Sequence, residues 1–574
     1  MDSATAVAAA ARAAAALSPR KRMKTGVPTI LSVGPWASKQ VDPLAKTMPV
    51  TSPTTGEVVS NVQLGSAADV DRAVAAAKEA HPAWAALTSK RRAAIMLKFH
   101  GLCTEHEDEL VELIMKENGK NRTEALGDLA KGLETVEWAC SIPQHAGAGR
   151  TLSVSGGIVC QEIRDPVGVV ACVVPFNFPF MVPMWTTPIA LVCGDAVVLK
   201  PSEKVPMTMN RVANLLYEAG VPPAVFQLVQ GAKEVVDALC DHPDIAALTF
   251  VGSSKVAKLV YERAKLTGKK ALALGACPKT LTCGLLCPKP VPKACPRRLA
   301  TSSKDHLTTT AVCTTLAGGA KNHLVSAPDC DLEMASSDIV ASFAGCAGQR
   351  CMAASVLLTI GAQPALIDKV VDKASKLAMG TGKGCMGPVI DEIAEARIRG
   401  FIDMAERDGA KVLLDGRTWA DKKMEGHGQY ASGHWVGPTV LEMPPGLRRH
   451  PAMHEEIFGP VLCVHPVTDA SEALAIEQAD PHGNAACIYT SSGATADWFS
   501  RRFSAAMIGV NIGVPVPREP FSFGGLEGSK SKYGEHDITG EGGLNFFSSL
   551  RKVTTKWASN PNAAPDAANF GGVM

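Results

Sequence analysis

Short apolar runs rich in β-branched residues alternate with helix-length segments between residues 167 and 251, and this alternation constrains the fold more than any other feature. The runs and the helices expected between them are VGVVACVV (167–174), a helix near 183–193, AVVLK (196–200), a helix near 206–219, FQLVQ (226–230), a helix near 233–240, and IAALTFV (245–251). Neighbouring strands joined by such long connections are parallel. We therefore expect a doubly wound α/β lobe that binds ligands at the carboxyl ends of its strands.

A second α/β lobe is expected from about residue 333 onward. Its predicted elements are helices near 364–379 and 391–409 and a strand around 436–441. Two large lobes with appendages agree with the length, because 574 residues exceed what one ordinary core accommodates.

A helical layer is predicted ahead of the first lobe. Ser66 and Asp69 form a variant of the capping box that begins a helix. A second helical run extends from Lys90 to about Asn118 and ends at Gly119.

The composition excludes several classes of function. The net charge is only +2, from 58 basic and 56 acidic residues, and no basic run is long enough to bind nucleic acid. Seventeen cysteines, an odd number scattered along the chain, favour reduced thiols over a disulfide framework. The apolar stretches are interrupted by charges or prolines, so no membrane span is expected.

The amino-terminal segment is rich in alanine and contains Arg12, Arg20, Lys21 and Arg22. This composition predicts an organelle transit peptide within a disordered leader over residues 1–40. A disordered leader without a targeting role is the alternative. At the other end, residues 558–574 are rich in Asn, Ala and Pro and are expected to be a disordered tail.

Residues 271–315 interrupt the rhythm of the first lobe, because they show neither helical nor strand periodicity and contain clustered prolines. We interpret them as an aperiodic insertion that is looped out or disordered. A translated intron is the other explanation. The cysteines of this segment lack a C-x-x-C pair, so no metal site is expected.

Cys351 is the candidate nucleophile, within the small-residue segment FAGCAGQRCM (343–352). Oxidation of an aldehyde through a covalent intermediate requires a thiolate, donors for the oxyanion and a nearby nicotinamide. By itself a single cysteine is more often a small buried hydrophobe. Cys346, about one helical turn earlier, is the rival and is interpreted as structural.

GQRCMA closely resembles the active-site thiol motif of the aldehyde dehydrogenase superfamily, and in particular of its CoA-acylating methylmalonate-semialdehyde branch. The segment PFNFPFMVPMW (175–185) resembles the superfamily's oxyanion segment. The resemblance implies that Cys351 is the nucleophile and that the Asn177 amide donates to the oxyanion together with the backbone N–H of Cys351. A turn asparagine beside prolines is the alternative interpretation of Asn177.

Three further segments, LKPSE (199–203), FVGS (250–253) and HEEIFGPV (454–461), resemble the superfamily's NAD-binding motifs. The NAD-binding residues implied by the resemblance are Phe176, Lys200, Glu203, Gly252, Ser253, Glu456 and Phe458. A carboxylate at Glu203 that accepts from ribose hydroxyls favours NAD over a 2′-phosphorylated cofactor. Gly252 and Ser253 come just before a helix, where a pyrophosphate binds well.

Hydrolytic members of the superfamily carry a glutamate base in a segment like LELGG, and here that position holds Ala273 or Ala317, depending on the register. Between Glu262 and Asp329 the only acid is Asp305, inside the insertion. A thioester without this base persists until an external thiol attacks it, so CoA is expected as co-substrate.

The resembled branch oxidises malonate or methylmalonate semialdehyde in valine and pyrimidine catabolism and releases the carboxylate as CO2. Arg350, next to the nucleophile, is the implied carboxylate-binding residue. The family has an arginine where this chain has Lys131, which cannot form the same bidentate contact. A hydrolytic aldehyde dehydrogenase and an inactive scaffold disabled by the insertion are the two alternatives.

The resemblance also implies a domain organisation. It assigns an NAD-binding domain to 41–150 and 165–326, a catalytic domain to 327–524, and an oligomerisation arm to 151–164 and 525–557. A homo-oligomer, dimer or tetramer, and location in the mitochondrial matrix are expected, with small molecules as the only other partners.

Overall fold

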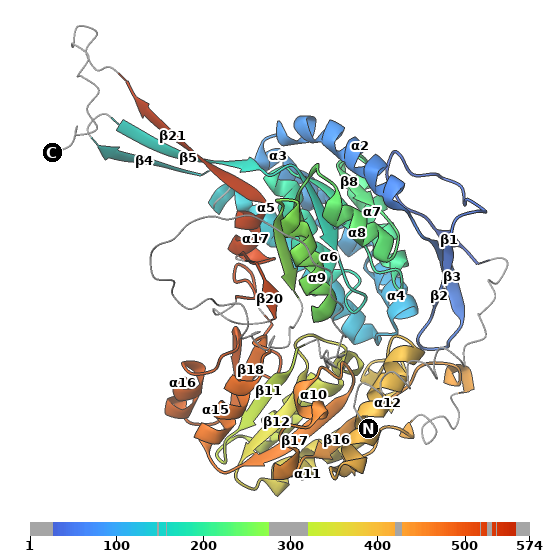
Figure 1. The fold of residues 1–574 in the computed structure, drawn as a ribbon, viewed down its shortest axis with the longest axis vertical. Helices are drawn as coiled ribbons and strands as arrows, with labels where there is room; N and C mark the ends of the chain where they lie inside the picture. Colours follow the sequence, from blue (N-terminus) through green and yellow to red (C-terminus); the bar gives the residue numbers. More distant parts are fainter. Residues whose placement is uncertain are drawn as a thin grey trace, which may run out of the picture.

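The computed structural model describes residues 27–145, 149–155, 158–274, 320–419, 428–516, 518–524, 531–534 and 536–557. Two α/β lobes lie against each other, and a three-stranded antiparallel arm projects from one of them (Figure 1). The expected tail and most of the expected leader and insertion lie outside the described residues.

The first lobe is built on a six-stranded sheet of order β20-β10-β9-β6-β7-β8, in which all strands but β20 are parallel. Its elements are β6 (Val169–Val173), α6 (Met181–Cys193), β7 (Ala196–Lys200), α7 (Pro206–Ala219), β8 (Phe226–Leu228), α8 (Lys233–Asp241), β9 (Ile245–Val251), α9 (Ser254–Leu266), β10 (Lys270–Leu274) and β20 (Lys532–Tyr533). The expected parallel sheet and the three expected helices are confirmed. We call this the six-stranded lobe.

Alternate residues along the strands of this sheet enter two different cores. In β6, Val170 and Cys172 pack with α3, α5, α6 and α7, whereas Val169, Ala171 and Val173 pack with α2, α8 and α9. Both faces are therefore buried, which explains why the strands read as continuous apolar runs. Because both faces are covered, a ligand can reach the sheet only at the carboxyl ends of the strands, where the following loops contact it.

The helical layer over this lobe contains α2 (Ala67–Ala85), α3 (Ser89–Glu105), α4 (Glu107–Asn118) and α5 (Arg122–His145), preceded by the small sheet of β1 (Thr29–Ile30), β2 (Thr47–Thr51) and β3 (Val58–Gln63). The Asp69 carboxylate accepts from the Ser66 backbone N–H at 2.7 Å, as the capping box predicts. The single helical run expected from Lys90 was wrong, because the backbone leaves helical geometry at His106 (φ −100°, ψ 23°) and starts a new helix. That new helix, α4, ends before Gly119 as expected.

The second lobe has a seven-stranded sheet of order β15-β16-β17-β12-β11-β18-β19. Its elements are β11 (Asn322–Ser326), α10 (Leu332–Ala344), β12 (Ala354–Ile360), α11 (Pro364–Ser375), β13 (Ala378–Met379), β14 (Cys385–Met386), α12 (Glu392–Arg407), β15 (Lys411–Leu414), β16 (Thr439–Glu442), α14 (Pro451–His454), β17 (Val461–Val467), α15 (Ala470–Ala479), β18 (Ala485–Tyr489), α16 (Gly493–Ser500) and β19 (Met507–Val510). Here too the two faces of the sheet enter two separate cores. We call this the seven-stranded lobe.

Two expected boundaries need correction. The first domain was expected to reach residue 326, but β11 pairs in parallel with β12 and β18 and so belongs to the seven-stranded lobe. The insertion was expected to begin at residue 271, but residues 270–274 form β10 beside β9. The chain therefore passes from one lobe to the other between β10 and β11, across residues 275–319, which lie outside the described part.

The arm consists of β4 (Arg150–Ser155), β5 (Ile158–Pro166) and β21 (Ser548–Lys556), which pair antiparallel (Figure 1). The segment expected as arm, 525–557, is only partly arm. Its β20 pairs with β10 in the six-stranded lobe, and α17 (Gly540–Phe546) packs against α6. Only β21 continues outward with β4 and β5.

Within the described residues, no helix is long and apolar enough to cross a membrane. Three or more His, Cys, Asp or Glu side chains in a metal-binding arrangement are likewise absent from this part of the chain.

Candidate active site

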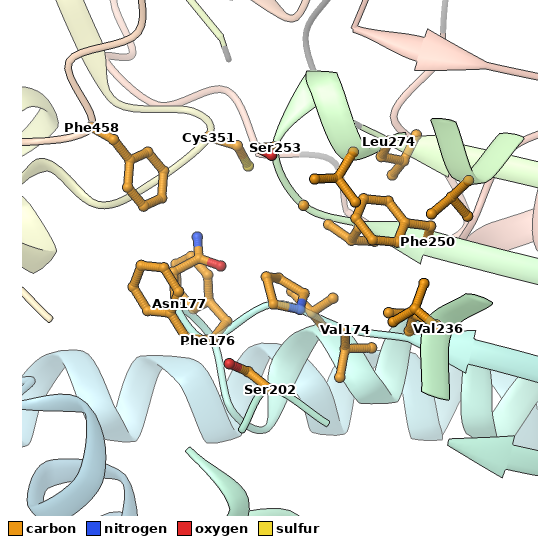
Figure 2. Close-up of a pocket in the computed structure, with 18 of the residues that line it drawn as sticks. Val174, Phe176, Asn177, Ser202, Val236, Phe250, Ser253, Leu274, Cys351 and Phe458 are labelled. Atoms are coloured by element: carbon orange, nitrogen blue, oxygen red, sulfur yellow. The ribbon is translucent and has the colours of Figure 1, made fainter. Parts of the chain in front are cut away.

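A cavity of about 950 Å³ lies between the two lobes and contains nine of the ten residues predicted for the site. It is lined by the carboxyl-terminal ends of β6, β7 and β9 on one side and by the Cys351 and Glu456 segments on the other. Figure 2 shows Cys351 and Phe458 across the cavity from Phe176 and Asn177. The predicted residues that line it are Phe176, Asn177, Lys200, Glu203, Gly252, Ser253, Cys351, Glu456 and Phe458.

Cys351 is presented by a tight turn after α10. The backbone takes left-handed φ values at Cys346 and Ala347, both 51°, and at Gly348, 68°. A Cβ on Gly348 would lie 2.1 Å from the Gly459 carbonyl oxygen, so only glycine allows this close approach. This turn places the Cys351 thiol at the cavity wall (Figure 2).

Two asparagines hold the peptide of the nucleophile. The side-chain amides of Asn322 and Asn484 both donate to the Cys351 carbonyl oxygen, at 2.9 and 2.8 Å, and Asn322 also donates to the Ala353 carbonyl at 2.9 Å. Sequence analysis did not identify these residues, because they are 29 and 133 positions from Cys351. The available signal in the sequence was the segment GGAKNH (318–323), which contains Asn322. Two donors therefore bind the Cys351 carbonyl oxygen and hold the peptide of the nucleophile in place.

Asn177 lies in the loop between β6 and α6, and its amide points into the cavity (Figure 2). Its Nδ2 donates to the Gln349 carbonyl oxygen at 3.0 Å, two residues before Cys351. A side-chain amide has two N–H donors. Among the contacts of the described residues the second donor has no acceptor, so it is free to bind an oxyanion beside Cys351.

The other end of the cavity has the charge pattern of a nucleotide site. Lys200 Nζ lies 2.8 Å from the Glu203 carboxylate. Burial acts to raise the pKa of Glu203, but Lys200, together with a backbone hydrogen bond and Lys204, lowers it by more, so the net pKa is lowered and the carboxylate is ionised at neutral pH. Ser253 precedes the 13-residue helix α9 and also lines the cavity, where N–H groups of a helix terminus attract phosphate. These residues fit the adenosine and pyrophosphate of NAD.

We expect Glu203→Ala to raise the KM for NAD by about tenfold, because a charge-assisted hydrogen bond contributes roughly 1.5–3 kcal/mol. The preference for NAD over NADP should narrow, because the carboxylate that repels a 2′-phosphate is gone. Initial rates with both cofactors measure the change. An unaltered NAD KM would exclude Glu203 from the ribose site.

Glu456 and Phe458 complete the wall next to Cys351. The Phe458 ring stands edge-on to the Phe176 ring with 6.0 Å between centroids, and Phe458 has a left-handed φ of 50°. Burial raises the pKa of Glu456, which accepts a hydrogen bond from the Ala320 backbone and has Arg397 nearby. Burial first, and the Glu456 carboxylate second, raise the pKa of Cys351 to about 12. The thiol is therefore protonated at neutral pH in this state.

Replacing Glu456 with glutamine should lower the pKa of the Cys351 thiol, because the negative charge that opposes thiolate formation is removed. The pKa should stay above that of a free thiol, because burial is the larger cause. The rate of alkylation by iodoacetamide between pH 7 and 10, in the cofactor-free protein, measures this shift. Identical pH profiles for the variant and the parent protein would contradict it.

Arg350 is the predicted site residue that does not line the cavity. Its guanidinium lies 3.7 Å from the Glu124 carboxylate and packs over Gly345, where an added Cβ would be 2.0 Å from Nη2. In this structure the Arg350 side chain faces Glu124 and Gly345 rather than the cavity, and its assignment as the residue that binds the substrate carboxylate stays a prediction. Lys131 pairs with Glu134 at 2.6 Å.

The two segments that could align with the hydrolytic glutamate motif lead to two different strands. Ala273 is buried in β10 of the six-stranded lobe, whereas Lys321 and Asn322 lead into β11 of the other lobe. Ala317 lies outside the described residues. Leu274 and Ala320 both line the cavity, so the two segments meet there. Within the described lining, the carboxylates are Glu203, Asp237, Asp391 and Glu456.

The fold and this cavity define the class of the protein. A model of the aldehyde dehydrogenase family matches residues 40–278 and 297–553. The chain belongs to this family and is an NAD-dependent oxidoreductase. The unmatched residues 279–296 fall inside the segment that sequence analysis identified as an insertion.

Individual relatives have narrower names. The chain is 36% identical over 541 residues to malonate-semialdehyde dehydrogenase 1 of Geobacillus thermodenitrificans, which covers 93% of this chain and 100% of the relative. The solved methylmalonate-semialdehyde dehydrogenase of Oceanimonas doudoroffii superposes with a TM-score of 0.81 at 33% identity, covering 93% of this chain and 99% of its own. A Sinorhizobium meliloti protein assigned to the same activity, solved with NAD, has a TM-score of 0.80 at 35% identity and covers 94% of this chain and all of its own.

Proposed function

We propose that this protein oxidises malonate or methylmalonate semialdehyde to acetyl-CoA or propionyl-CoA, with NAD as oxidant and CoA as acyl acceptor. The observation that supports the proposal most directly is the cavity, which contains both Cys351 and the residues that fit NAD. The relatives that match about nine-tenths of this chain are named as malonate- or methylmalonate-semialdehyde dehydrogenases. The substrate carboxylate leaves as CO2, so one semialdehyde, NAD⁺ and CoA give one acyl-CoA, CO2 and NADH.

In the first half-reaction the Cys351 thiol releases its proton to solvent, and the resulting thiolate attacks the aldehyde carbon. The oxyanion that forms accepts hydrogen bonds from the free N–H of the Asn177 amide and from the Cys351 backbone N–H. When bound, NAD supplies the hydride acceptor. Asn322 and Asn484 keep the Cys351 peptide fixed while this charge develops. Loss of hydride leaves an acyl group on the Cys351 sulfur as a thioester.

The second half-reaction transfers that acyl group to the CoA thiol. Support for transfer over hydrolysis comes from the alanine that occupies the position of the hydrolytic base in either register, Ala273 in β10 or Ala317. Among the carboxylates of the described lining, only Glu456 acts on the pKa of Cys351, so it is the candidate base for the hydrolytic alternative.

The test is NADH absorbance during turnover of methylmalonate semialdehyde, with and without CoA. Fast NADH formation only with CoA supports the acylating reaction. Equal rates without CoA would support hydrolysis instead, and Glu456→Gln should then abolish turnover. No NADH in either case would support an inactive scaffold disabled by the insertion.

We also propose that the protein assembles into a homo-oligomer through the arm. The arm exposes Leu152, Leu550 and Trp557, which are 53%, 47% and 81% exposed in the single chain. Light scattering of the protein with and without residues 547–574 tests this, and a monomer in both cases would contradict it.

Location in the mitochondrial matrix is proposed from the composition of residues 1–40 alone, and a role in valine catabolism is proposed from the resemblance to the methylmalonate-semialdehyde branch. The named relatives are bacterial, and they argue against a transit peptide. Cell fractionation and amino-terminal sequencing of the mature chain test it.

A further inference from the structure

The loop that carries Asn177 is fastened by side chains from outside the cavity. Lys120, just after α4, donates from Nζ to the Asn177 backbone carbonyl at 2.7 Å and to the Asp128 carboxylate at 2.6 Å. The two charged side chains are 2% and 0% exposed. The backbone of Asn177 is thus bonded to a fully buried ion pair.

Asp128 extends this contact to the start of the next helix. Its Oδ2 binds Lys120, and its Oδ1 accepts from the Met181 backbone N–H at 2.7 Å, where α6 begins. Asn118, at the end of α4, donates to the Phe176 carbonyl at 2.8 Å. The contacts therefore fix the loop immediately before Asn177, at Asn177, and four residues after it.

The sequence of the loop explains why outside support is needed. Pro175 and Pro179 have no backbone N–H, so the loop has fewer donors with which to stabilise itself. Its carbonyl groups at Phe176 and Asn177 are instead satisfied by Asn118 and Lys120. Lys120 Nζ also lies 3.9 Å from the centroid of the Phe178 ring. The position of Asn177 is consequently set by the helical layer.

A buried ion pair adds little net stability, because desolvating both charges costs about as much as their attraction returns. A pair that spans a catalytic loop can instead set its geometry. Misplacing a reacting group by about 1 Å can reduce the rate by about 10²-fold.

We propose that Lys120 and Asp128 are positioning residues for Asn177, and that they hold its amide where the oxyanion forms. This inference rests on the proposed role of Asn177 as an oxyanion donor. Lys120 and Asp128 do not line the cavity and act only through the loop.

A double-mutant cycle between Lys120→Met and Asn177→Ala tests the proposal. Lys120→Met keeps the apolar stem but removes the charge and the donors to Asn177. It should slow the single-turnover formation of NADH by about 10- to 100-fold in the parent protein. In the Asn177→Ala background it should change that rate by less than about threefold, because the amide it positions is already absent.

Glu117→Gln is the matched control. Glu117 is a buried acid in α4, three residues before Lys120, but it holds the start of α7 by accepting from the N–H groups of Met207 and Thr208 at 2.6 and 2.9 Å. Any decrease in the rate of NADH formation that Glu117→Gln causes should be the same in the parent protein and in Asn177→Ala. A merely structural role for Lys120 would show the same independence.

If Lys120→Met does not fold, Asp128→Asn replaces it in the double-mutant cycle with Asn177→Ala. The asparagine keeps an acceptor for the Met181 N–H, and the double variant Lys120→Met/Asp128→Asn leaves no unpaired buried charge. If Lys120→Met, or Asp128→Asn in its place, slowed NADH formation by the same factor in both backgrounds, the positioning role would be overturned. The proposed role of Asn177 would then still stand. A normal rate for Asn177→Ala by itself would overturn the proposed role of Asn177, and the inference with it.

Discussion

Cys351→Ala is expected to reduce NADH formation by more than about 10⁴-fold, because no covalent intermediate can form without the thiolate. The cavity brings Cys351 together with Asn177 and Glu456, and its peptide is held by two asparagine amides. Steady-state NADH absorbance with the semialdehyde, NAD and CoA measures the loss. The circular dichroism spectrum should be unchanged, because the substitution removes one sulfur atom.

Cys346→Ala is the control for this experiment. Cys346 is buried in the same turn, five residues earlier, and burial raises the pKa of its thiol. It does not line the cavity, so its variant should keep activity within about tenfold of the parent protein. If Cys346→Ala were the inactive variant and Cys351→Ala the active one, the assignment of the nucleophile would be wrong.

The fold could be predicted well wherever burial imposed a regular pattern. The strands of the six-stranded lobe are buried on both faces, so they appear as continuous apolar runs, and α7 has the bounds that the sequence predicts. The break at His106 was missed because both flanking segments have helical periodicity. The place of β11 was missed because pairing partners, which are distant in sequence, decide to which sheet a strand belongs.

For the site as well, residues in local motifs could be predicted, whereas contacts between residues distant in sequence could not. Cys351, Asn177 and the cofactor residues lie in short segments whose resemblance to a family could be recognised, and they meet in one cavity. Arg350 was assigned by its position beside the nucleophile, yet the direction of its side chain depends on Glu124, 226 residues away in sequence. Likewise, nothing near Cys351 in sequence indicates the support from Asn484.

The Lys120–Asp128 pair illustrates why such support is hard to predict. Both residues lie in a polar stretch whose composition indicates a solvent-exposed surface, but their side chains are fully buried. They become recognisable only when the loop before α6 is placed against α4 and α5. The residues that carry the chemistry could therefore be identified from motifs, and those that set its geometry required the structure.

Asn177→Ala is expected to lower the single-turnover rate of NADH formation by about 10²- to 10³-fold, or roughly 2.7–4 kcal/mol of transition-state stabilisation. The amide N–H that faces the cavity is lost, and the oxyanion keeps only the backbone N–H of Cys351. The KM for NAD should change by less than about threefold, because the cofactor residues Lys200 and Glu203 lie at the other end of the cavity. Stopped-flow absorbance measures the rate, and a titration with NAD measures binding.

Asn210→Ala is a matched control for that substitution. Asn210 lies in α7 of the same lobe and also donates its amide to a backbone carbonyl, that of Leu31 at 3.2 Å, but it does not line the cavity. The loss of one such hydrogen bond should affect stability by about 1 kcal/mol and leave the rate within about twofold. Equal effects of the two variants on the rate would mean that Asn177 is a structural residue of the loop. Both amides donate to a backbone carbonyl, but only that of Asn177 faces the thiol. A decrease in rate that occurs only in Asn177→Ala is therefore due to lost stabilisation of the oxyanion and not to lost support of the fold.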